Sequence, residues 1–118
     1  MSNHLGEFEK LLLFALLAGQ EDSDGAVLRQ NIEERTGRVV APGAVYTAMD
    51  RLQGRGFVTS EVVKAPAEQG GRRQKRYRLR SEGAIALDRA VRELESMAEG
   101  LGDALTDAVK TALGRGGK

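Results

Sequence analysis

The residues most suited to binding another molecule lie between positions 71 and 80, where six basic side chains occur with no acid among them. They are Arg72, Arg73, Lys75, Arg76, Arg78 and Arg80. Tyr77 and Leu79 alternate with bases near the end of this run, which predicts a strand with one apolar and one cationic edge. A guanidinium group matches phosphate oxygens with paired hydrogen bonds. The pattern therefore predicts a surface for a polyanion.

Charge is spread unevenly along the chain. The formal net charge is only +1 over 118 residues. Between positions 35 and 80, however, eleven Lys and Arg residues stand against three Asp and Glu residues. The flanking segments carry the remaining acids. Because the local field decides how a surface meets phosphate, the basic middle of the chain favours a nucleic-acid partner.

Composition excludes several classes of site. A chain of 118 residues fits one modest domain. Without cysteine there is no disulfide, thiolate zinc site or cysteine nucleophile, and a reducing cytoplasm is the expected location. His4, the one histidine, is expected in a solvated tail, so no nucleophile has a histidine base. We expect neither an enzyme nor a metal or cofactor site.

No membrane partner is expected. The apolar run from Leu11 to Ala18 is too short to span a bilayer. Glu7 and Glu9 precede it, whereas a signal peptide begins with a basic segment.

The first half of the chain predicts three helices. The pattern predicts a helix over residues 7–18 that is buried on most sides and ends at Gly19. A second helix is expected over residues 25–36, capped by Ser23 or Asp24 and ended by Gly37. The predicted inner face of the second helix is formed by Val27, Leu28 and Ile32.

A third helix is expected to begin at Pro42, since proline loses no hydrogen bond at the first helical position. Val45, Met49 and Leu52 recur at helical spacing and should face inward. The opposite face then holds Gly43, Tyr46, Thr47, Asp50 and Gln53. The tight turn between the second and third helices makes a helix-turn-helix candidate.

Residues 57–63 and 74–80 predict an antiparallel hairpin with a long tip around Gly70 and Gly71. Three helices followed by a two-stranded hairpin describe a winged helix-turn-helix, a mostly α (α+β) fold. Residues 1–80 would form this DNA-binding domain, residues 81–113 a long C-terminal dimerisation helix and residues 114–118 a flexible tail.

The last helix carries an apolar seam spaced alternately by four and three residues, which predicts a partner helix and hence a homodimer. The residues expected to make the dimer are Leu87, Val91, Leu94, Ala98, Leu101 and Leu105. Gly100 and Gly102 interrupt the seam, so a bend or break is expected there.

The chain resembles the PadR family of transcriptional regulators over roughly residues 5–100. The resemblance rests on the order and spacing of short segments, which are Leu5-Gly6-Glu7-Phe8, Ile32-Glu33-Glu34-Arg35-Thr36-Gly37, Gly43-Ala44-Val45-Tyr46-Thr47, Asp50-Arg51-Leu52, Gly56-Phe57-Val58, Gly70-Gly71-Arg72-Arg73, Lys75-Arg76-Tyr77-Arg78-Leu79 and Glu82-Gly83. Asp24 stands where the family commonly has an aromatic residue, and Ala41 where it has a hydroxyl residue.

The resemblance implies a third helix in the major groove, a basic wing on the flanking backbone and a two-fold dimer made by one C-terminal helix. Double-stranded DNA is the implied partner, at a palindromic operator, and repression is the family's usual action. A small-molecule effector could sit at the dimer interface, although the last helix lacks aromatic residues. The residues expected to contact DNA are Arg38, Pro42, Gly43, Ala44, Tyr46, Thr47, Arg51, Gly71, Arg72, Arg73, Lys75 and Arg76.

Several roles stay open at this point. Tyr46 could pack under the wing instead of touching DNA, and Asp50 could accept a hydrogen bond from cytosine or pair with Arg51 or a wing arginine. Arg78 and Arg80 could be structural, since they lie nearer the base of the strand. The rival function is a winged helix that binds another protein and never touches DNA.

Overall fold

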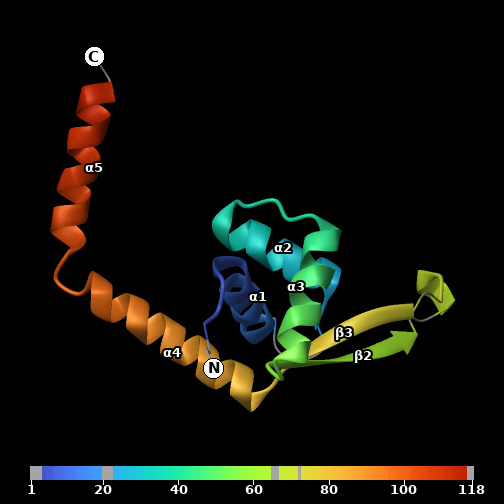
Figure 1. The fold of residues 1–118 in the computed structure, drawn as a ribbon. Helices are drawn as coiled ribbons and strands as arrows, with labels where there is room; N and C mark the ends of the chain where they lie inside the picture. Colours follow the sequence, from blue (N-terminus) through green and yellow to red (C-terminus); the bar gives the residue numbers. More distant parts are fainter. Residues whose placement is uncertain (1–3, 20–22, 65–66, 72, 117–118) are drawn as a thin grey trace. The chain divides into compact units, whose positions relative to one another are not determined.

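The structure, a computed structural model, describes residues 4–19, 23–64, 67–71 and 73–116 (Figure 1). It divides into two compact units, Met1–Asp88 and Arg89–Lys118. The elements of the first unit are α1 (Glu7–Ala18), β1 (Ser23–Asp24), α2 (Gly25–Thr36), α3 (Pro42–Gly54), β2 (Val58–Lys64), η1 (Ala67–Gln69), β3 (Arg73–Leu79) and the start of α4 (Ser81–Ala98). The second unit holds the rest of α4 and α5 (Gly102–Gly116). The predicted winged helix-turn-helix architecture is confirmed.

Helix limits in the first unit follow local capping chemistry, as the sequence predicted. The Asp24 carboxylate accepts a hydrogen bond from the Val27 amide at 2.9 Å and so begins α2. Gly37 ends α2 in a left-handed conformation, with φ of 76°, which glycine adopts without a side-chain clash. Pro42 begins α3.

The core lies where the inner faces of the three helices meet the sheet. Fully buried side chains come from every layer, and they include Leu12, Leu13, Leu28, Val45, Met49, Leu52, Val58 and Tyr77. The core prediction for Val27 is wrong, since its side chain is 43% exposed. Phe14 of α1, a helix expected to be buried on most sides, is equally exposed.

The sheet has three antiparallel strands in the order β1-β3-β2, one more than predicted. Strands β2 and β3 form the wing, which extends beyond the helices (Figure 1). Their register runs from Val58 opposite Leu79 to Lys64 opposite Arg73. Strand β1 adds only two residues, which place Ser23 opposite Tyr77 and Asp24 opposite Arg76. Two residues are too few to show the alternation of apolar and polar side chains that predicts a strand, so β1 is seen only in the structure.

The C-terminal region is two helices, not the single helix predicted for residues 81–113. The break predicted at the glycines is confirmed, because α4 ends at Ala98, Gly100 has φ of 76° and α5 begins at Gly102. Helix α5 continues to Gly116, and the remainder of the predicted tail, residues 117–118, lies outside the described residues. Within the described residues, none of the helices combines the length and apolar character needed to cross a membrane.

The first two turns of α4 belong to the first compact unit, which ends at Asp88. Gly83, Ala86 and Leu87 are buried there. Leu87 is only 4% exposed, which corrects its assignment to a dimer surface, since its side chain is already covered by its own chain.

Gly83 provides a test of this packing. A Cβ on residue 83 would collide with the carbonyl oxygen of Phe57, which already accepts a hydrogen bond from the Arg80 amide at 3.0 Å. We expect Gly83→Ala to lower the free energy of unfolding by about 1–3 kcal/mol, measured by urea denaturation. Gly54→Ala is the matched control, because a Cβ there would meet nothing within 4 Å. Equal stability of the two variants would contradict the close contact between α4 and the loop before β2.

Candidate nucleic-acid interface

The outer face of α3 is open to solvent. Val45, Met49 and Leu52 are fully buried, which turns Gly43, Thr47 and Asp50 outward. A Cβ on Gly43 would meet nothing within 4 Å, so the backbone at the start of α3 is bare and could approach another molecule closely. Pro42 and Ala44 are exposed beside it. The face that the sequence predicted for base contacts is therefore accessible.

Two side-chain contacts hold the wing beside this face. The Ser60 hydroxyl on β2 donates to the Gln53 side-chain oxygen on α3 at 2.9 Å. The Lys75 ammonium on β3 lies 3.9 Å from a carboxylate oxygen of Asp50 on α3. The wing residue paired with Asp50 is therefore a lysine and not an arginine. These contacts make α3 and the base of the wing one continuous surface.

Strand alternation decides which wing cations share that surface. Side chains two residues apart lie on the same side of a strand, so Arg73 and Lys75 lie on the side of the buried Tyr77. Lys64 pairs directly with Arg73 across the hairpin and joins them. We call Lys64, Arg73 and Lys75 the inner wing cations. Sequence reasoning did not select Lys64, because only the register of the hairpin shows its neighbour.

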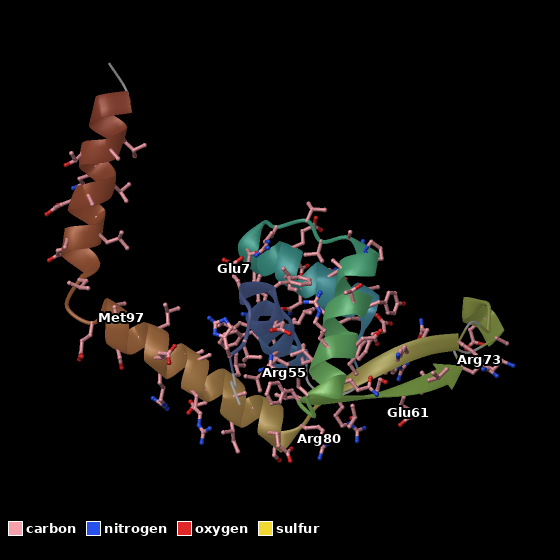
Figure 2. The ribbon with its side chains drawn as sticks, in the orientation of Figure 1. Glu7, Arg55, Glu61, Arg73, Arg80 and Met97 are labelled. Carbon is pink, nitrogen blue, oxygen red and sulfur yellow. The ribbon has the colours of Figure 1, made fainter. Side chains whose placement is uncertain are left out.

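Arg76 lies on the other side of the wing, which corrects its grouping with Arg73 and Lys75. Its cross-strand neighbours are Asp24 on β1 and Glu61 on β2. Figure 2 shows Glu61 directed away from α3, while Arg73 lies near the tip of the wing. Two carboxylates beside Arg76 reduce its attraction for phosphate.

The wing tip contains Gly71, with φ of 64°, a conformation that favours glycine. This residue shapes the turn that brings Arg73 back opposite Lys64. The predicted contact Arg72 lies outside the described residues.

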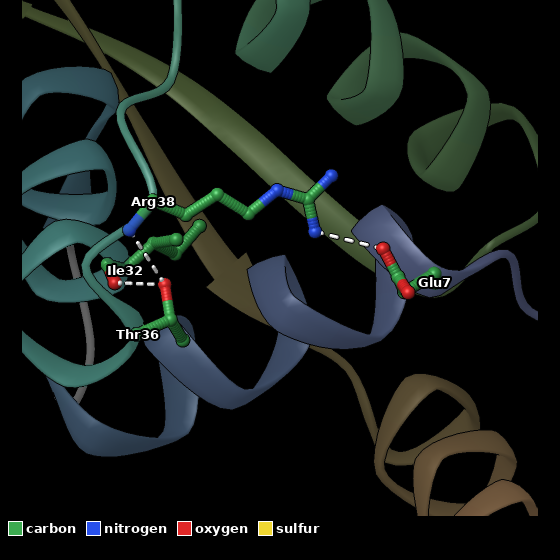
Figure 3. Close-up of polar contacts among 4 residues, drawn as sticks. All are labelled: Glu7, Ile32, Thr36 and Arg38. Carbon is green, nitrogen blue, oxygen red and sulfur yellow. Dashed lines mark hydrogen bonds and ion pairs between the residues drawn. The ribbon is translucent and has the colours of Figure 1, made fainter. Parts of the chain in front are cut away.

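Arg38, a predicted contact to the DNA backbone, also makes contacts within the protein. Its guanidinium donates to the Glu7 carboxylate on α1 at 2.8 Å (Figure 3). The guanidinium also lies 5.9 Å from the centre of the Phe8 ring. Its amide donates to the Thr36 hydroxyl, which in turn donates to the Ile32 carbonyl at 2.7 Å. Arg38 therefore ties the turn of the helix-turn-helix to α1. An exposed ion pair of this kind is weak, so phosphate could still exchange for Glu7.

Two further arginines take structural positions. The Arg29 side chain donates to the Val40 carbonyl at 3.0 Å and braces the connection into α3. Arg80 lies 3.6 Å from Glu82 at the start of α4, in line with the structural role left open for it. Arg51 is exposed on the flank of α3 opposite Gln53, away from the wing.

Tyr77 anchors the wing below the outer face of α3. Its ring is fully buried, and its hydroxyl has no hydrogen-bond partner among the described residues. Burial, followed by electrostatic repulsion from Tyr46 and Asp50, raises the pKa of Tyr77 to about 12. Tyr46 itself is 50% exposed, so it meets solvent on one side and is covered on the other.

Comparison with known proteins gives a consistent result. Residues 13–89 match the family described as the transcriptional regulator PadR-like family. No curated protein matches the chain closely.

Solved structures share the fold at low sequence identity. A PadR family transcription regulator from Clostridium difficile R20291 is 22% identical, with a TM-score of 0.69 over 85% of this chain and 99% of that one. A PadR family regulator from Eggerthella lenta is 23% identical, with a TM-score of 0.66 over 84% of this chain and 86% of that one. F93 from STIV, a winged-helix DNA-binding protein, is 16% identical, with a TM-score of 0.65 over 82% of this chain and 97% of that one.

The buried Tyr77 hydroxyl predicts how stability depends on pH. Its pKa of about 12 in the folded chain exceeds the ordinary value of 10.0, so between these values the unfolded chain loses a proton that the folded chain keeps. Stability should therefore fall as pH rises through this window, by up to about 2 kcal/mol from this group. Tyr77→Phe should be no less stable at pH 7 and should show a smaller fall. Parallel curves of unfolding free energy against pH for the two proteins would contradict the assignment.

Proposed function

Because this chain belongs to the PadR-like family of transcriptional regulators, we propose that it recognises a specific sequence in double-stranded DNA. The outer face of α3 would enter the major groove, which admits one helix and presents a distinct pattern for each base pair. The inner wing cations would bind phosphates beside the groove and fix the register of the protein on the duplex.

The observation that carries this proposal is the placement of Lys64, Arg73 and Lys75 on the wing side next to α3. Cations there can meet the backbone while α3 meets base edges. Apart from the loose contact of Lys75 with Asp50, the described residues contain no ion pair to these three cations. Their charge is therefore available to phosphate.

We further propose a homodimer through the second unit, with the first unit as the DNA-binding domain. Exposed apolar side chains gather on α4, on α5 and in the connection between them, and they are Leu94, Met97, Leu101, Leu105, Val109 and Leu113, exposed by 47–71%. Such a row would remain in water in a monomer. Val91 and Ala98 extend the row on α4. Two DNA-binding domains related by a two-fold axis would bind a palindrome whose half-sites lie about 34 Å apart, or a multiple of that distance.

The corner between α4 and α5 is the place we propose for an effector, if the regulator responds to one. A hollow of about 450 Å³ there is lined by Leu94, Met97, Ala98, Leu101, Gly102, Ala104 and Leu105. Its lining suits an apolar compound, and binding there would change how the two copies meet. We propose repression as the action, as is usual in the family, by a dimer that occupies promoter DNA.

The first test is the salt dependence of binding to duplex DNA. Affinity should fall steeply with salt, and replacing Lys64, Arg73 and Lys75 together by alanine should make the log-log slope shallower by about 0.9 for each phosphate that the protein no longer neutralises. Arg76→Ala, on the far side of the wing, is the control and should change the slope little. A flat salt response of the unaltered protein would favour the rival function, a winged helix that binds a protein partner.

The second test concerns the dimer. Leu94→Asp combined with Leu101→Asp should yield monomers in sedimentation, because two charges would be buried in the proposed contact. Val39→Asp is the control, since Val39 is an apolar residue of the first unit that is even more exposed than Leu94 and Leu101. A dimer that persists in the double variant would contradict the proposed contact.

A further inference from the structure

Asp50 is an unusual residue for a surface that meets DNA. It is the one acid in α3, and its side chain is 72% exposed in the middle of the outer face. Gly43 and Thr47 lie one or two turns before it on the same face, and Gly54 lies one turn after it. A carboxylate in this position approaches the duplex with the same charge as the phosphates, and so it weakens binding to DNA of arbitrary sequence.

The partner of Asp50 is held too loosely to cancel this effect. The 3.9 Å separation from the Lys75 ammonium is longer than a hydrogen bond, and the carboxylate faces solvent. Exposed pairs of this kind are weak and easily exchanged. Lys75 can therefore turn to a phosphate when DNA arrives, and the Asp50 carboxylate then needs a new hydrogen-bond donor.

The major groove offers few donors to a carboxylate. Guanine presents two acceptors and thymine an acceptor and a methyl group, whereas cytosine and adenine each present an amino donor. The adenine donor lies beside the adenine N7 acceptor, which repels a carboxylate, so the cytosine amino group is the better partner for Asp50. A carboxylate placed against guanine or thymine loses its hydration without gaining a hydrogen bond, which costs binding. The unfavourable effect of the Asp50 carboxylate on binding is thus relieved best where a cytosine amino group faces it.

We propose that Asp50 is the residue that makes DNA binding selective: its carboxylate disfavours non-cognate duplex and accepts a hydrogen bond from a cytosine amino group in each half-site, while Lys75 holds that carboxylate in the free protein. The inference rests on the proposed DNA-binding function. It adds a repulsive element to the attractive contacts of the inner wing cations, and specificity commonly needs both.

The test uses Asp50→Asn, which keeps the shape of the side chain and removes its charge. Glu61→Gln is the matched control, because it removes one acid from the other side of the wing. Each full-length protein is used to select duplexes from a randomised library. Affinity is then measured for the duplex selected by the unaltered protein and for a random duplex of the same length, at one salt concentration.

We expect Asp50→Asn to bind random duplex about three- to tenfold more tightly and the selected duplex more weakly, with loss of cytosine preference at one position of each half-site. Glu61→Gln should keep that preference and the ratio between the two affinities. The inference is overturned if Asp50→Asn selects the same sequence as the unaltered protein, or if both variants change the two affinities alike. Absence of any duplex binding by the unaltered protein at low salt would instead remove the proposed function itself.

Discussion

Burial of Tyr77 is the constraint on which the rest of this surface depends. Side chains alternate between the two faces of a strand, so the fully buried Tyr77 ring fixes the face on which each remaining side chain of β3 lies. Arg73 and Lys75 are thereby placed beside α3, and Arg76 is placed between Asp24 and Glu61. A register shift of one residue would exchange the two sets. The unpaired Tyr77 hydroxyl shows that, among the described residues, the ring is held by packing and not by a hydrogen bond from its oxygen.

Ion pairs divide the basic residues of the first unit into two groups. Arg38 and Arg55 pair with Glu7 and Glu9 of α1, and Arg80 lies near Glu82 of α4. Arg55 also stacks over the Phe57 ring at 4.8 Å. These cations hold helices and turns together. Lys64 and Arg73 lack such partners among the described residues, so their charge on the inner side of the wing is available to an external polyanion.

Much of this arrangement could be predicted from local sequence. Capping by Asp24, the stop at Gly37, the start at Pro42 and the buried face of α3 follow from chemistry within a few residues. The break at Gly100 could be predicted for the same reason. The exposed face of α3 could also be predicted, because the apolar residues at helical spacing define the buried face and the remaining residues must lie on the opposite one.

Features that depend on distant partners could not be predicted in this way. Strand β1 exists because Ser23 meets Tyr77, far along the chain, and Arg38 is engaged because α1 brings Glu7 to it. The burial of Leu87 likewise depends on how α4 leaves the hairpin, although its spacing alone matched the exposed seam. Residue type and spacing identified the cations, but pairing across the sheet decided their roles.

The absence of cysteine allows the most direct measurement of the central claim. Single-cysteine variants at Thr47, Arg73 and Glu61 can each be treated with a thiol reagent, with and without saturating duplex DNA. If α3 and the inner side of the wing form one DNA-binding surface, the duplex should slow modification in Thr47→Cys and Arg73→Cys and leave Glu61→Cys unchanged. Equal modification rates at all three positions, with DNA bound, would contradict the account.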